Sequence, residues 1–174
     1  LERIIAKLNG FLNDPDQTLK TYNKDDQTSK YARAIAYYKK GKTKQAIATV
    51  DELIALNSKD GYLYDLKGQI LSESGDQKNA IIAYNQAVEL NQNNNLARIA
   101  LANAIINLDS GDKKITDFAV ENLLTALRVE KTDSNIYKQL AKAYAQNHDL
   151  GRSYLALAQM SLMEESLEKT KKYI

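Results

Sequence analysis

Small and apolar residues recur in this chain at a constant spacing of 34 residues. The recurring pairs are Gly41 and Gly75, Ala46 and Ala80, and Leu56 and Leu90. A period of this length, with small residues where two helices would touch, is typical of stacked helix–turn–helix repeats. The chain has one proline and seven glycines in 174 residues, which also favours helix. The sequence therefore predicts an all-α repeat array, of the kind that holds other proteins rather than performing chemistry.

The second repeat matches the tetratricopeptide (TPR) pattern when it is aligned from Gly61. That pattern requires aromatic, glycine and alanine residues at fixed positions, and the chain supplies Tyr64, Gly68, Ala80, Tyr84 and Ala87. The two small residues would let helix backbones approach closely, and the tyrosines would fill the space between helix layers. We therefore expect a right-handed TPR superhelix of about four helix–turn–helix repeats, preceded by two short helices.

The four repeats are predicted at residues 27–60, 61–94, 95–133 and 134–163. The third is five residues longer than the period, and we assign the extra residues, 113–117, to a longer turn or an extra helical turn. In the fourth, Ser153 stands where alanine is expected. Residues 164–174 are predicted to form one more helix, which is truncated.

Residues 1–26 precede the repeats and are expected to form two helices that lead to a missing N-terminal domain. One face of the first helix carries its apolar residues, Ile4, Ile5, Leu8 and Leu12. Asp14 and Pro15 then provide a cap and a first helical residue for the second helix. The chain begins with Leu1 rather than Met, so we expect a fragment of a longer protein.

Composition argues against several functions. The chain has 24 Lys and Arg against 22 Asp and Glu, a balance that disfavours nucleic acid or an anionic membrane as the main partner. No apolar run approaches the roughly 20 residues that span a bilayer. Cysteine is absent, and the one histidine, His148, falls in a predicted exposed turn, so a metal cluster or an activated nucleophile is not expected. We predict that this fragment is not an enzyme, with no catalytic residue, metal ligand or cofactor.

The candidate binding surface is the inner groove, which the first helix of each TPR repeat lines. The residues expected to contact a partner are Tyr31, Tyr38, Tyr62, Gln69, Ile99, Asn103, Asn107, Lys138 and Lys142. Asn103 and Asn107 share a helical face, and their amides can both donate to and accept from an extended peptide backbone. For Tyr31 and Ile35, packing against the leading helices is an equal alternative. Asp65 disfavours an acidic C-terminal tail as the ligand.

Several stretches carry a resemblance to one family. They are residues 6–12 (AKLNGFL), 31–38 (YARAIAYY), 66–71 (LKGQIL), 87–90 (AVEL) and 98–101 (RIAL). With them the chain resembles the C-terminal TPR region of the BepA-like, HtpX-related zinc metallopeptidases of Gram-negative bacteria. The resemblance implies a periplasmic protein of outer-membrane and cell-envelope protein quality control. In that family a separate N-terminal domain with His-Glu-x-x-His binds zinc.

The resemblance further implies that the TPR part binds unfolded envelope proteins or the outer-membrane assembly machinery. None of the zinc ligands falls within this sequence, so zinc is expected only in the missing domain. The alternative is a stand-alone TPR scaffold or adaptor without a protease, which would be cytoplasmic.

Overall fold

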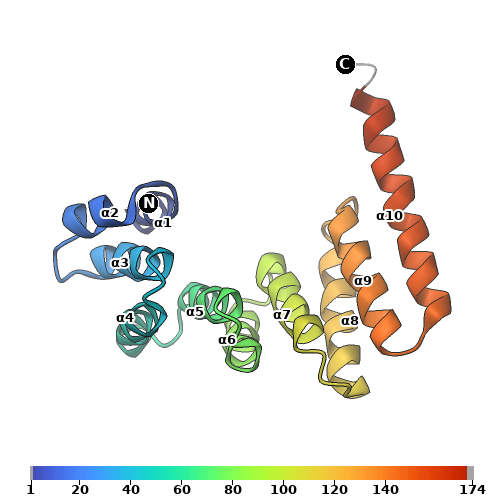
Figure 1. Cartoon of the computed structure of the whole chain (residues 1–174), viewed down its shortest axis with the longest axis horizontal. Coiled ribbons are helices and arrows are strands. Elements are labelled where there is room, and N and C mark those ends of the chain that lie inside the picture. Colours follow the sequence, from blue (N-terminus) through green and yellow to red (C-terminus); the bar gives the residue numbers. More distant parts are fainter. Residues whose placement is uncertain (1, 172–174) are drawn as a thin grey trace. The chain divides into compact units, whose positions relative to one another are not determined.

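The computed structural model describes the backbone of residues 2–171 and the side chains of residues 2–165. Within this part the chain forms ten helices and no strand (Figure 1). The helices are α1 (Glu2–Leu12), α2 (Pro15–Thr21), α3 (Gln27–Lys39), α4 (Thr43–Leu56), α5 (Gly61–Glu73), α6 (Gln77–Leu90), α7 (Asn95–Leu108), α8 (Lys113–Leu127), α9 (Ser134–Gln146) and α10 (Leu150–Lys171). None of these helices is both long enough and apolar enough to cross a lipid bilayer.

The chain divides into two compact units, residues 1–91 and 92–174. The first holds α1 to α6 and the second holds α7 to α10. The sequence predicts leading helices, one repeat array and a terminal helix, and it does not predict this division after residue 91. Within the units, α3 packs on α4, α5 on α6, α7 on α8 and α9 on α10. The predicted fold class, an all-helical array of four helix–turn–helix pairs behind two short helices, is confirmed.

Side-chain caps fix where the helices begin. The caps that accept a hydrogen bond from a backbone N–H of the first turn are Asp14, Asp26, Asp60, Asp76, Asn94, Asp112, Asp133 and Asp149. Such a cap satisfies one of the N–H groups that a helix start leaves without a partner. The inner helices α3, α5, α7 and α9 therefore begin at Gln27, Gly61, Asn95 and Ser134.

The turns between paired helices use the left-handed backbone region. Gly41 and Gly75 have φ values of 70° and 87°, and His148 occupies the corresponding turn of the last pair with φ 58°. Glycine adopts this region without strain, whereas a side chain is disfavoured there. His148 is exposed in this turn, as the sequence predicts.

The core of the first unit is built where α3, α4 and α5 meet. Its largest buried side chains include Tyr31, Ile35, Val50, Leu66 and Ile70. Gly68 of α5 lies against the ring of Tyr84 of α6, so the contact that the TPR pattern predicts is present. This contact packs α5 closely against α6.

The structure also settles how two segments are formed. Residues 113–117 are the first five residues of α8, so the insertion in the third repeat is helical rather than a longer turn. Residues 164–171 continue α10 instead of forming a separate helix, because no proline or glycine after Gly151 interrupts it. Residues 172–174 of the expected terminal helix lie outside the described part.

The first leading helix shows its apolar face to solvent. Ile4, Ile5, Leu8 and Leu12 are 62%, 46%, 53% and 77% exposed. The buried residues of α1 are the small ones, Ala6 and Gly10, on its opposite face. Amphipathicity alone therefore identifies the helix but not the side on which it packs.

Candidate functional site

The inner helices of the first unit, α3 and α5, carry four of the predicted partner-binding residues. Tyr31 is only 3% exposed and belongs to the core beside α1, so it is not available to a partner and the alternative reading holds for it. Tyr38 and Gln69 are half-buried, and Tyr62 is 48% exposed. The available surface of this unit is therefore smaller than the sequence suggests.

A hydrogen-bonded cluster joins α3 to α5. The Tyr38 hydroxyl donates to Glu73, and Gln69 Nε2 donates to the same carboxylate at 2.9 Å. Partial burial and the Glu73 carboxylate raise the pKa of Tyr38 to about 12. The hydroxyl therefore stays protonated at neutral pH and keeps its donor role.

Asp65 lies one turn before Gln69 on α5. Burial raises the pKa of its carboxyl, and the nearby Lys7 ammonium partly opposes that rise. Asp65 and Lys7 make no ion pair within 4.0 Å in the described structure. Asp65, which in the sequence disfavours an acidic C-terminal tail as the ligand, is thus a partly buried carboxyl group.

Beside these groups a small cavity opens between α1, α3 and α5. It has a volume of about 290 Å³ and is lined by Arg3, Ile4, Lys7, Tyr31 and Tyr62. Arg3 forms an ion pair with Asp60, and its guanidinium lies 5.4 Å from the centroid of the Tyr62 ring. Sequence reasoning missed Arg3 and Lys7, because nothing in a leading helix indicates that it joins the inner surface.

The inner helices of the second unit, α7 and α9, carry the other five predicted residues. Asn103 is half-buried and Asn107 is exposed one turn later on α7, while Lys138 and Lys142 are exposed one turn apart on α9. Ile99 is only 9% exposed, so it belongs to the core and not to an open surface. Gln146 Nε2 of α9 donates to the carbonyl of Ile106 of α7 at 2.9 Å and fixes the two helices against each other.

Asn103 shares one feature with Asn147, a buried side-chain oxygen without a hydrogen-bond partner among the described residues. Its Oδ1 atom is buried and has no hydrogen-bond partner among the described residues. A buried acceptor without a partner costs free energy, so most such atoms in folded proteins are satisfied. Lys138 and Lys142 make no ion pair within 4.0 Å in the described part of the chain. This surface therefore combines an unused acceptor, an exposed amide and two cations without a counter-ion.

Two further hollows lie away from the predicted groove. One, of about 330 Å³, lies between α4, α5 and α6, and its apolar lining includes Ile47, Tyr64 and Ile82. The other, of about 450 Å³, surrounds the turn before α10 and includes Asp117, His148 and Arg152. Their polar groups are largely paired, as Lys67 Nζ with Asp51 Oδ1 at 2.7 Å and Lys113 Nζ with Asp117 Oδ2 at 2.7 Å.

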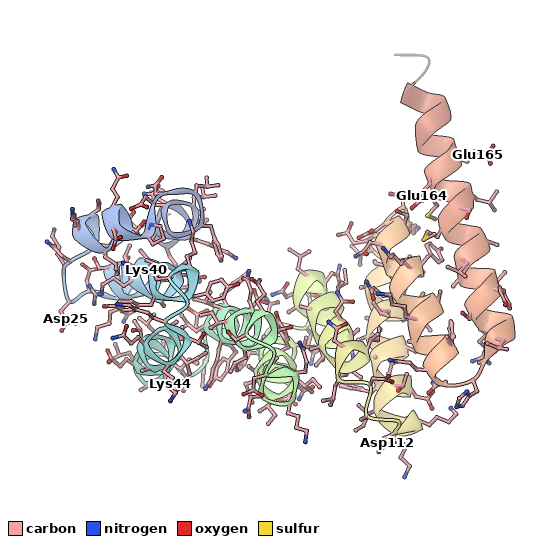
Figure 2. The ribbon with its side chains drawn as sticks, in the orientation of Figure 1. Asp25, Lys40, Lys44, Asp112, Glu164 and Glu165 are labelled. Atoms are coloured by element: carbon pink, nitrogen blue, oxygen red, sulfur yellow. The ribbon has the colours of Figure 1, made fainter. Side chains whose placement is uncertain are left out.

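The acidic residues are dispersed rather than gathered. Figure 2 shows Glu164 and Glu165 on different sides of α10. Asp25 forms an ion pair with Lys30 at 3.1 Å. Among the residues that the structure describes, no group of three or more histidine, cysteine or acidic side chains could hold a metal ion.

Comparison with known proteins agrees with this architecture. Residues 62–94, which comprise α5, α6 and the turn that follows, match the tetratricopeptide repeat family. Residues 62–94 are a TPR repeat. A TPR repeat-containing protein of Methanocaldococcus jannaschii is 32% identical over 136 residues, which are 72% of this chain and 24% of the relative. The chain thus spans about a quarter of that relative's length.

Solved structures share the fold. A crystal structure of MamA aligns with a TM-score of 0.79 at 17% identity, covering 97% of this chain and 92% of MamA. YrrB, described as a TPR protein with an unusual peptide-binding site, aligns with a TM-score of 0.77 at 19% identity, covering 99% of this chain and 91% of YrrB. At these identities the likeness establishes a TPR fold and transfers no binding residue.

Proposed function

We propose that this chain is a protein-interaction module that binds an extended segment of a partner protein along α7 and α9. The observation that carries the proposal is a pair of amides on one helical face of α7: Asn107 is exposed, and Asn103 is half-buried with an Oδ1 atom that has no hydrogen-bond partner among the described residues. The exposed amide of Asn107 can both donate to and accept from the peptide backbone of a ligand. The Oδ1 atom of Asn103 is covered, so its amide must turn outward before it can do the same.

The spacing of the two amides suits an extended ligand. Residues four apart on a helix are separated by about 6 Å along its axis, at 1.5 Å per residue. Along an extended chain the backbone groups that face one side recur every second residue, or about every 6.7 Å. Asn103 and Asn107 can therefore bond two successive backbone positions on one edge of the ligand.

The charges on α9 define which side chains the ligand should carry. Lys138 and Lys142 are exposed one turn apart and have no acidic partner within 4.0 Å in the described structure. They favour a segment with an acidic side chain opposite α9, and they raise its association rate at low salt. We expect micromolar affinity for one such module, about −8 kcal/mol.

The parent protein has two candidates. The resemblance of the sequence supports a periplasmic zinc metallopeptidase of envelope quality control, with this module as its substrate-binding part. The comparisons support the second candidate better, a TPR scaffold or adaptor without a protease, because the relative from M. jannaschii is described only as TPR repeat-containing. We therefore propose the scaffold, for which a cytoplasmic location is expected. A coding sequence with His-Glu-x-x-His upstream of Leu1 would reverse this choice.

The test of binding is a double substitution in the proposed site. Peptides selected by display against the full chain are titrated against the wild type and against Asn103→Ala with Asn107→Ala. We expect the double variant to bind at least about tenfold more weakly, because two hydrogen bonds contribute about 1 kcal/mol each.

The control is Gln159→Ala, which removes an exposed amide from the outer helix α10 and should leave binding unchanged. Circular dichroism verifies that all variants keep their helix content. Equal affinity of a folded double variant and the wild type would refute the assignment to α7 and α9.

A further inference from the structure

The leading helix α1 lies on the part of α3 that a TPR repeat normally leaves open for a ligand. Both α1 and α2 contact α3, and Figure 1 shows them on the side of α3 away from α4. Tyr31 and Ile35 occupy the fifth and ninth positions of the first repeat, which the TPR pattern assigns to the inner groove. In this protein they are 3% and 0% exposed. The inner face of α3 is therefore occupied by a segment of the same chain.

The contact between α1 and α3 is close and is made by small residues. A Cβ atom placed on Gly10 would lie 3.0 Å from Cβ and Cδ1 of Ile35, which is tighter than nearly all real contacts. Ala6, one turn earlier, is fully buried. Only glycine at position 10 lets α1 approach this closely, so the face by which α1 binds is set by its sequence.

Polar contacts hold both ends of α1. Arg3 pairs with Asp60 and stacks on Tyr62 at the start of α5. At the other end, Lys39 Nζ donates to the carbonyls of Phe11 and Asn13 at 2.8 and 2.7 Å. These partners belong to α3, to α5 or to the residue just before α5. The surface therefore recognises a helix through a central apolar contact and a polar contact at each end.

Among the large apolar residues of α1, only Phe11 packs partly buried against the core around α3, α4 and α5, whereas Ile5, Leu8 and Leu12 are exposed. In the core around α3, α4 and α5, by contrast, large side chains such as Val50 and Leu66 are almost fully buried. The helix α1 thus contacts α3 and its neighbours through two small residues, one partly buried phenylalanine and a few polar groups, and it buries fewer large side chains than the paired helices of the repeats.

We propose that the inner face of α3 and the start of α5 form a helix-binding surface that α1 occupies in cis. The partner that fits it is a second helix with a small-residue face and an arginine near its N-terminus, which competes with α1. This proposal deepens the proposed function, since it assumes that inner faces bind partners, but it concerns the first unit and a helical ligand. Because α1 is joined to α3 through residues 13–26, which include α2, its binding is intramolecular, and an external helix must overcome the high effective concentration of α1.

The experiment uses the full chain and, as its probe, a fluorescently labelled synthetic peptide with the sequence of residues 1–14. Gly10→Leu places a side chain against Ile35 and should dislodge α1 without changing α3. Leu8→Gln is the matched control, because Leu8 lies on the exposed face of the same helix. We expect the peptide to bind the Gly10→Leu chain at least about tenfold more tightly than the wild type, and the Leu8→Gln chain to behave like the wild type.

A second variant keeps the test decisive. Arg3→Ala removes the contacts of α1 with Asp60 and Tyr62, so it weakens the hold of α1 on this surface and should also increase peptide affinity, without placing a new side chain against Ile35. Hydrogen exchange read by mass spectrometry should show faster exchange in α1 of Gly10→Leu, with α3 to α6 unchanged. The proposal is overturned if α3 loses protection together with α1, or if neither variant binds the peptide more tightly than the wild type.

This result is independent of the test of the proposed function, which concerns the second unit and display-selected peptides. If the display-selected peptides do not bind α7 and α9 but the labelled peptide replaces α1, only the proposed peptide site of the second unit is refuted. If α1 cannot be exchanged while Asn103 and Asn107 matter for binding, only the present proposal falls.

Discussion

Replacing Gly68 by alanine tests the packing that gives the repeats their shape. A Cβ atom at this position would lie 2.6, 2.7 and 2.8 Å from atoms of the Tyr84 ring, whereas ordinary contact begins at 3.4 Å. Tyr84 is only 5% exposed, so the ring has little room to withdraw. Overpacking of this kind costs about 1–3 kcal/mol. Alanine also gains about 1 kcal/mol over glycine in helix propensity, so the net change is a loss of up to about 2 kcal/mol.

A double-mutant cycle separates the two contributions. In a Tyr84→Leu background the ring is absent, and Gly68→Ala should then stabilise the first unit through helix propensity alone. Urea denaturation followed by circular dichroism gives the four free energies of unfolding. We expect a coupling of about 1–3 kcal/mol between the two positions.

Gly151→Ala on α10 is the control for propensity, because its nearest neighbour, Asp149 Oδ1, is 3.8 Å away and no clash arises. It should stabilise the second unit by up to about 1 kcal/mol. If Gly68→Ala stabilised the wild-type chain as Gly151→Ala does, the assigned contact between α5 and α6 would be wrong.

Three further predictions concern charge. Burial raises the pKa of the Asp65 carboxyl, so the folded state binds its proton more tightly than the unfolded state and loses stability as pH rises through that pKa. Asp65→Asn should therefore raise the urea midpoint at pH 7 relative to the wild type and have less effect at about pH 4, close to the ordinary aspartate pKa. The hydrogen bond from the Ser29 backbone N–H lowers the pKa of Asp26. This cap therefore stabilises α3 when the pH lies above the ordinary aspartate pKa of about 3.9, and its contribution is lost as the pH falls through the lowered pKa. The urea midpoint of Asp26→Ala should accordingly lie below that of the wild type at pH 7, and the gap should narrow in acid. Lys138→Ala with Lys142→Ala should weaken binding of an acidic peptide and flatten its salt dependence in fluorescence titrations, and unchanged salt dependence would exclude these lysines from the site.

The helix pairs could be predicted because their determinants are local. Gly41 and Gly75 mark turns that need a positive φ, and the alanines at the 34-residue spacing mark close helix contacts. The last pair was harder to place, because His148 takes the turn position that glycine holds elsewhere. A period still identifies the turn when the residue type does not.

The candidate site was less predictable, because it depends on contacts between segments far apart in sequence. The TPR pattern assigns Tyr31 to the groove, the sequence leaves packing against the leading helices as an equal alternative, and the burial of Tyr31 in the structure favours the packing. In the same way, the side on which α1 packs is set by Gly10 against Ile35, while its apolar face would suggest the opposite orientation. The lack of a partner for Asn103 Oδ1 is also a property of the folded environment that no sequence pattern records.

The most direct test of the account is to locate a bound peptide on the second unit. The chain contains no cysteine, so single cysteines can carry a photoreactive cross-linker without background. Ala145→Cys places it on α9, at an inner position of the last pair, and Gln159→Cys places it on the outer helix α10. A display-selected peptide should cross-link from position 145 and not from position 159. Cross-linking from position 159 alone would contradict the claim that inner helices bind the partner.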